Sequence, residues 1–177
     1  INVSKVLKSE FLTQGPKTSE FENKIKLLVG SKYALVTNSG SSALLLACKA
    51  LSLKPGDLFW TAPNSFVATA NCGILCDLKI DFIDIDPNTW NISIKDLEKK
   101  LKIAKKKRKL PKLIIVVHLG GLPVNPIKLK NLSRKYKFKI IEDASHSFGG
   151  KYYFKKVGCS KWSDITVFSF HPVKIIT

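Results

Sequence analysis

The sequence predicts an α/β domain of three layers, α/β/α, in which helices cover both faces of a mainly parallel sheet. Short apolar segments alternate with segments of helical periodicity along the chain, and this alternation is the first observation behind the prediction. The second is that segment 113–117 is continuously apolar, as expected for a strand buried on both faces. The third is that hydrophobic residues make up 45% of the 177 residues, enough for one domain with a core.

Small residues mark the helix ends in the first half of the chain. Ser19 and Glu22 have the spacing of a capping box, and Gly30 ends the helix that follows. After a short strand at 33–37, the polar turn 38–42 opens a mostly apolar helix. The further elements expected in this half are the helix Ala43–Leu51, the strand Phe59–Thr61, the helix Val67–Leu75 and the strand Ile80–Ile85.

The second half continues the alternation. Ser93 caps a basic helix, and Pro126 stands at the first position of another helix, directly after Asn125. Because ligands of such sheets bind at the carboxyl ends of the strands, polar residues at those ends are the candidates for a site. The elements expected in this half are a helix from Ile94 to about Lys107, the strand Leu113–Val117, a helix from Pro126, and the strands Lys139–Glu142 and Ile165–Phe170.

The chain is strongly basic, with 30 Lys and Arg against 13 Asp and Glu and a formal charge of +17. The basic run at 105–109 has two interpretations, a nucleic-acid-binding patch or the solvated end of a helix. We favour the second and expect no nucleic-acid partner, because no aromatic residues interleave the run as stacking platforms. A basic surface would still attract a diphosphate substrate over long range.

Other classes of protein are disfavoured by composition. No apolar run is long enough to span a bilayer, and no charged leader precedes an apolar segment, so we expect a cytoplasmic protein without a membrane partner. Four cysteines without zinc-ligand spacing are expected to be reduced, and we expect no metal. Met is absent, and both ends lie in sequence of folded character, so we expect a fragment.

Three polar features at strand ends suggest a chemistry. The turn 38–42 suits a phosphate, although Ser and Gly also simply cap helices. Asp143 ends a strand, where a buried acid needs a cationic partner; the alternative is a cap of the next loop. Lys174 lies among apolar residues, where desolvation would lower its pKa and free a neutral amine for a Schiff base; the alternative is a surface lysine. Together, in this order, they are the groups that pyridoxal phosphate needs.

The order and spacing of several motifs resemble the DegT/DnrJ/EryC1/StrS sugar aminotransferases, of the fold-type I class that uses pyridoxal phosphate. The resemblance covers almost all of the chain. It implies that residues 1–177 are the pyridoxal-phosphate-binding large domain, truncated and incomplete, and that a small carboxyl-terminal domain is absent. The motifs are LTQGP (12–16), NSGSSAL (38–44), FVATAN (66–71), DID (84–86), EDASH (142–146) and FSFHPVK (168–174).

The resemblance also implies roles for individual residues. Lys174 matches the lysine that forms the Schiff base, and Asp143 matches the partner of the pyridine nitrogen. His146 occupies the position that bonds the phenolic oxygen of the cofactor, and Phe66 matches the aromatic residue that stacks on its ring. The phosphate contacts are Ser41, Ser42 and Ser169, and Thr13 and Gly15 lie in a motif near the site.

Segments 143–149 and 168–174 resemble the branch of the family that serves pseudaminic acid synthesis. This implies that a full-length homodimer transfers an amino group from glutamate to a nucleotide sugar, a UDP-linked 4-keto-6-deoxy-N-acetyl-L-altrosamine. Lys174 argues against the branch that carries His in its place and acts as sugar dehydratases. Another pyridoxal-phosphate enzyme, an aminotransferase for another 4-keto sugar and a non-catalytic remnant remain alternatives. We expect residues 1–177 alone to be inactive.

Overall fold

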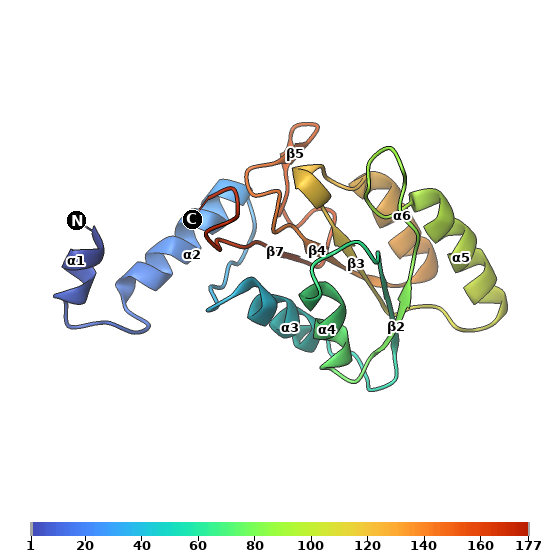
Figure 1. The fold of residues 1–177 in the computed structure, drawn as a ribbon, viewed down its shortest axis with the longest axis horizontal. Helices are drawn as coiled ribbons and strands as arrows, with labels where there is room; N and C mark the ends of the chain where they lie inside the picture. The colour runs from blue at the N-terminus through green and yellow to red at the C-terminus, as the bar shows by residue number, and fades with distance from the viewer. Residues whose placement is uncertain (1, 177) are drawn as a thin grey trace.

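A five-stranded sheet forms the centre of the computed structural model, which describes residues 2–176 (Figure 1). Every strand pair in this sheet is parallel, so the predicted mainly parallel sheet is confirmed. The strands are β1 (Leu58–Thr61), β2 (Lys79–Phe82), β3 (Leu113–Val117), β4 (Lys139–Asp143) and β7 (Ile165–Val167), in the order β2-β1-β3-β4-β7.

Helices cover both faces of this sheet (Figure 1). Successive residues of a strand point to opposite faces, and on β1 Phe59 packs with one helix layer while Trp60 packs with the other. The three-layer prediction is therefore confirmed. One layer contains α3 (Gly40–Ala50) and α4 (Ala68–Ile74), and the other contains α5 (Ile94–Lys106) and α6 (Pro126–Tyr136).

The chain reverses its direction of travel across the sheet once. From β1 it passes through α4 to β2 at the edge; it then crosses back over β1 through α5 to β3, and continues through α6 to β4. Because such crossovers are right-handed, the reversal puts α4 on one face and α5 and α6 on the other. It also leaves a switch point between β1 and β3, where sheets of this kind bind ligands at the carboxyl ends of the strands.

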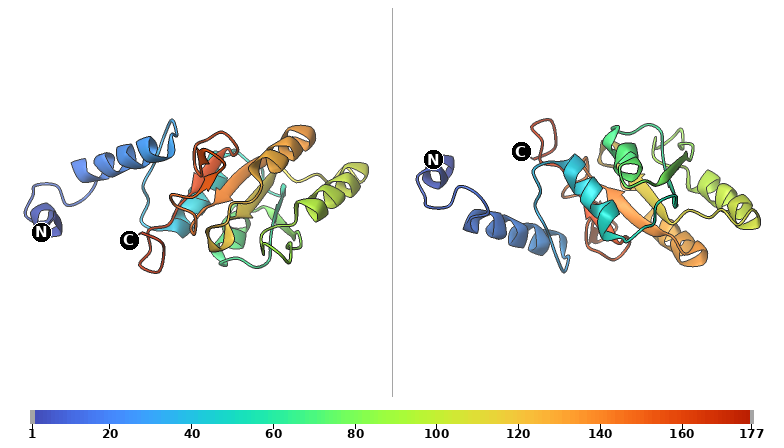
Figure 2. Two further views of the ribbon diagram at one scale, coloured as in Figure 1. Left: turned by 90° about the horizontal axis from the view of Figure 1, so that it is seen from above. Right: turned by 90° about the horizontal axis from the view of Figure 1, so that it is seen from below.

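The helices α1 (Asn2–Leu7) and α2 (Pro16–Val29) project away from the sheet (Figure 2). The expected capping box is wrong, because α2 already begins at Pro16, whose fixed backbone angle suits the first helical position. Ser19 therefore lies inside the helix, and Glu22 instead accepts a hydrogen bond from the amide of Val36 at 2.9 Å. Gly30 ends the helix as expected, with φ at 77°.

Segment 33–37 is not a strand, contrary to expectation. A strand needs a ladder partner, and no described strand pairs with this segment, in which Tyr33 and Leu35 are 76% and 77% exposed. Two other strands end earlier than expected, β2 at Phe82 and β7 at Val167.

The sequence also left some short elements unpredicted, namely α1, the 3-10 helix η1 (Leu119–Gly121) and the hairpin of β5 (Lys151–Tyr152) and β6 (Lys155–Lys156). Among residues 2–176, no helix is long and apolar enough to cross a membrane.

Candidate active site

Asp143 is the last residue of β4 and lies at the carboxyl edge of the sheet. Its side chain is only 4% exposed, and it shares the face of Ile141, which packs against α3 and α4. Its Oδ1 accepts hydrogen bonds from the amide (3.2 Å) and hydroxyl (2.7 Å) of Ser145. Its Oδ2 accepts one from the hydroxyl of Thr69 on α4, at 2.7 Å.

No basic nitrogen of the described residues lies within 4.0 Å of the Asp143 carboxylate. A buried acid is costly unless it is paired, hydrogen-bonded or neutralised. The donors of Ser145 and Thr69 meet part of this need, and a cationic group bound beside the carboxylate would meet the rest. The surroundings of Asp143 therefore fit a ligand that carries a protonated nitrogen.

Lys174 and His146 meet at the same edge of the sheet. The Nζ of Lys174 lies 2.9 Å from Nε2 of His146. Burial lowers the pKa of His146, the charge of Lys174 lowers it further, and the charge of Asp143 opposes both. A neutral His146 can accept a hydrogen bond from the Lys174 ammonium through Nε2. The structure thus brings Asp143, His146 and Lys174, which the sequence placed at strand ends, into one cluster.

A second group of polar residues gathers at the amino end of α3. Ser39 caps this helix and accepts a hydrogen bond from the amide of Ser42 at 3.1 Å. Ser169 packs beside it, because a Cβ built on Gly40 would lie 3.4 Å from the Cβ and Oγ of Ser169. Ser41 lies in the same first turn. Amides at a helix start and nearby hydroxyls suit a phosphate group, so Ser41, Ser42 and Ser169 lie where such a group could bind.

The other residues predicted for the site lie differently. Phe66 stands in the loop between β1 and α4 with 70% of its surface exposed, so its ring is accessible for stacking. Gly15 instead caps α2, and a Cβ there would lie 2.8 Å from the Cβ of Phe11. Thr13 lies beside it in the segment between α1 and α2, which projects away from the sheet (Figure 2). The structure does not bring Thr13 and Gly15 to the cluster.

Sequence reasoning missed Thr69, which is fully buried and contacts Asp143 directly. The available signal was its position within the segment 66–71, where a hydroxyl lies just past Phe66 at the start of a helix. The loop that follows β1 and the first turn of α4 both lie near the carboxyl end of that strand. A contact with an acid 74 positions later could not be read from that segment alone.

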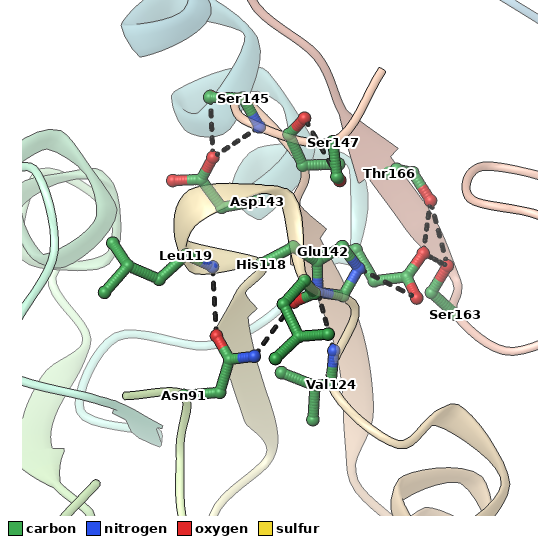
Figure 3. Close-up of polar contacts among 12 residues, drawn as sticks. Asn91, His118, Leu119, Val124, Glu142, Asp143, Ser145, Ser147, Ser163 and Thr166 are labelled. Carbon is green, nitrogen blue, oxygen red and sulfur yellow. Dashed lines mark hydrogen bonds and ion pairs between the residues drawn. The ribbon is translucent and has the colours of Figure 1, made fainter. Parts of the chain in front are cut away.

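Glu142 belongs to a separate buried network beside the site. Figure 3 shows Asp143 and Glu142 leaving β4 in different directions. The hydroxyls of Ser163 and Thr166 donate to Glu142 Oε2 at 2.8 and 2.7 Å, and His118 Nε2 lies 3.5 Å from Oε1. Burial by itself would raise the pKa of Glu142, but the hydrogen bonds from His118, Thr166 and Ser163 outweigh it and lower the pKa. This network links the ends of β3, β4 and β7.

Asn91 anchors the loop that follows β3. Its Oδ1 accepts from the amide of Leu119 and its Nδ2 donates to the carbonyl of Leu122, each at 2.9 Å (Figure 3). Both polar atoms of the Asn91 side chain therefore have hydrogen-bond partners inside the protein, and these two bonds hold the loop in shape. In the next turn, the carbonyl of His146 lies only 2.8 Å from where a Cβ on Gly121 would stand, and Gly121 has φ at 87°. A side chain there would therefore displace the backbone of the site.

Cysteines and metal ligands take no part in the cluster. Cys48 and Cys72 lie buried between α3 and α4 with their sulfurs 3.6 Å apart, and all four cysteines are free thiols. Within the part of the chain that the structure describes, no group of three or more His, Cys, Asp or Glu residues could hold a metal ion.

Relatives of known sequence or structure match nearly all of this chain. It is 43% identical over 175 residues to the UDP-4-amino-4,6-dideoxy-N-acetyl-beta-L-altrosamine transaminase of Campylobacter jejuni subsp. jejuni serotype O:23/36 (strain 81-176), covering 99% of this chain and 45% of the relative. The structure of Helicobacter pylori PseC, an aminotransferase involved in the biosynthesis of pseudoaminic acid, superimposes with a TM-score of 0.90 at 36% identity, covering 99% of this chain and 45% of that one.

A third similar structure is the PLP-form of the sugar aminotransferase Spr1654 from Streptococcus pneumoniae, with a TM-score of 0.87 at 26% identity over 99% of this chain and 46% of that one. The chain thus spans about half the length of the relatives that it matches. The family model of the DegT/DnrJ/EryC1/StrS aminotransferases matches residues 1–177, the whole of the sequence. The chain therefore belongs to the DegT/DnrJ/EryC1/StrS aminotransferase family.

Proposed function

We propose that this chain carries the pyridoxal-phosphate-binding part of a nucleotide-sugar aminotransferase. Residues 1–177 form the large domain without its later segments, and a small carboxyl-terminal domain completes the protein. The observation that carries the proposal is the buried carboxylate of Asp143, which has no cationic partner among the described residues and lies beside the His146 and Lys174 pair.

The residues at the carboxyl edge can hold this cofactor. Ser41, Ser42 and Ser169 would bind its phosphate at the start of α3, where the helix dipole favours an anion. Phe66 is exposed and could stack on its ring, and His146 would form a hydrogen bond with its phenolic oxygen. When bound, pyridoxal phosphate supplies an aldehyde for covalent attachment and a ring that withdraws electrons.

Two side chains perform the proton chemistry. Asp143 would keep a proton on the ring nitrogen, because a buried carboxylate stabilises a positive charge placed against it. Lys174 would hold the cofactor through its amine, and the same amine could move a proton at the substrate carbon as a general acid and base. His146 Nε2 is the acceptor that keeps the Lys174 amine at the edge of the sheet.

The proposed substrates are glutamate, as amino donor, and a UDP-linked 4-keto-6-deoxy-N-acetyl-L-altrosamine. Support for the sugar comes from the Campylobacter relative, whose name specifies a UDP-linked altrosamine. The charge of +17 also favours the approach of a diphosphate from a distance. We further propose that the full-length protein is a homodimer in the cytoplasm.

The test is to incubate the full-length protein with pyridoxal phosphate, glutamate and a set of UDP-linked 4-keto sugars, and to detect aminated sugar by mass spectrometry. We expect amination of the altrosamine-type ketone and none with Lys174→Ala. Amination only of keto acids derived from amino acids, with no activity on any nucleotide sugar, would overturn the substrate class.

A further inference from the structure

We propose that Thr69 is a positioning residue for Asp143, which it holds through a chain of hydroxyl groups that begins at Ser65. This inference rests on the proposed function, because it assigns the orientation of the carboxylate that faces the cofactor ring. The hydroxyl of Thr69 donates to Oδ2 of Asp143 at 2.7 Å, and both side chains are buried, at 0% and 4% exposure.

The direction of the chain follows from the number of protons. A hydroxyl carries one proton, and that of Thr69 is donated to Asp143. The Oγ of Ser65 lies 2.8 Å from Oγ1 of Thr69, so Ser65 must be the donor in this second bond. The order is therefore Ser65 to Thr69 to Asp143, and consecutive hydrogen bonds of this kind polarise and strengthen one another.

The main chain around Thr69 leaves its hydroxyl available for this task. The amide of Thr69 bonds the carbonyl of Phe66 at 3.0 Å, and its own carbonyl accepts from the Cys72 thiol at 3.3 Å. A β-branched side chain in a helix has few rotamers, which keeps the hydroxyl in one place. The bond to Asp143 thus ties the start of α4 and the Phe66 loop to the end of β4.

The acceptor sites of the carboxylate limit what else it can bind. A carboxylate offers about four lone-pair sites. Ser145 occupies Oδ1 with two donors and Thr69 occupies Oδ2 with one. One site on Oδ2 is left, which is enough for a single N–H group such as that of a protonated ring. Thr69 and a ring nitrogen would then share Oδ2, so the loss of the Thr69 hydroxyl would leave Oδ1 as the carboxylate's only tethered oxygen and loosen its orientation.

The experiment compares Thr69→Val with Thr69→Ser in the full-length protein. Val keeps the shape and removes the hydroxyl, so we expect kcat to fall roughly tenfold to a hundredfold with little change in KM, because one hydrogen bond to a charged group is lost. The pH at which the absorption band of bound pyridoxal phosphate changes should shift as well. Thr69→Ser should restore both properties. A purely structural role would leave the pH of the spectral change where it is, and it would not lower kcat selectively while KM stays the same.

Thr61→Val is the matched control. Thr61 is 1% exposed at the end of β1, and its hydroxyl has no hydrogen-bond partner among the described residues. This control makes the same exchange of atoms at an equally buried position, so it should leave the spectrum and kcat unchanged. If Thr69→Val does not fold, Ser65→Ala takes its place, because it removes only the donor to Thr69; we expect the same shifts at smaller size.

The outcomes separate this inference from the proposed function. A wild-type protein that gives no absorption band with pyridoxal phosphate overturns the proposed function. A normal wild-type band, together with Thr69→Val or Ser65→Ala variants that match Thr61→Val in spectrum and kcat, overturns the role of Thr69 alone.

Discussion

The Nζ atom of Lys174 lies 2.9 Å from Nε2 of His146, which stands 28 positions earlier in the chain. The two residues follow different strands, His146 after β4 and Lys174 after β7, and these strands are parallel neighbours in the sheet. Parallel pairing brings their carboxyl ends to one edge, and the contact follows from it. The amine is thereby held at the edge of the sheet that also carries Asp143, whose charge acts on His146.

Reduction of the full-length protein with borohydride in the presence of pyridoxal phosphate should attach the pyridoxyl group to Lys174. The reason is that this amine lies 2.9 Å from His146, whose pKa is also affected by the charge of Asp143. Peptide mapping by mass spectrometry locates the label. Lys24→Arg, at a side chain that is 71% exposed on α2, is the control and should not change the result. A label on another lysine in the wild type contradicts the assignment.

Asp143→Asn should leave cofactor binding largely intact and lower kcat on the order of a hundredfold or more. Asn has a similar size but no charge with which to stabilise a protonated ring nitrogen. Cofactor absorbance and steady-state rates measure the two effects. Asp57→Asn, in the turn before β1 at the opposite edge of the sheet, serves as the control. Near-normal turnover of the Asp143→Asn variant would remove Asp143 from its role.

His146 makes the stability of the fold sensitive to mild acid. Its pKa in the folded protein is lowered from the ordinary value of 6.5, so the unfolded chain takes up a proton first as the pH falls. Stability is therefore complete above pH 6.5 and decreases below it. In thermal unfolding between pH 7.5 and 5, about the range in which His titrates, His146→Gln should lose less stability than the wild type. His171→Gln, at an exposed residue near Lys174, should behave like the wild type.

The sequence was sufficient to predict the layers of the fold and the strand-end positions of Asp143 and Lys174. The continuous apolar run of β3 indicates a strand that is covered on both faces, and parallel strands bring their carboxyl ends to one edge, so Asp143 and Lys174 could be expected at the same edge. Pairing was harder to predict, because segment 33–37 is apolar enough for a strand but has no described partner. Thr69 was missed for a related reason: its contact with Asp143 depends on how α4 packs across the sheet.

The 177 residues expressed by themselves should associate with one another and turn over no substrate. Large apolar side chains lie exposed along the first part of the chain, among them Leu27 at 78% and Leu35 at 77%. Apolar surface of this kind favours association, and the charge of +17 opposes it only in part. Light scattering, cofactor absorbance and an aminotransferase assay check the prediction. A monomeric, soluble chain with measurable turnover would contradict it.

Glu142→Gln should lower the free energy of unfolding by about 1–3 kcal/mol, because it replaces a buried carboxylate that accepts three donors with an amide. The NH2 group of Gln must face either His118 Nε2 or the hydroxyls of Ser163 and Thr166. Since the Val124 amide donates to Nδ1 of His118, the proton of this ring is on Nε2, and an amide NH2 placed there would oppose it.

The effect of Glu142→Gln should also depend on pH in a defined direction. The pKa of Glu142 is lowered from 4.5 in the folded protein, so its contribution is present above pH 4.5 and is lost as the pH falls through the folded value. Urea unfolding at pH 7 should therefore separate wild type from variant more than unfolding in acid does. Glu98→Gln, which breaks only an exposed pair with Lys102 on α5, should change stability by less than about 0.5 kcal/mol. Equal effects of the two variants at pH 7 would mean that the buried network does not stabilise the ends of β3, β4 and β7.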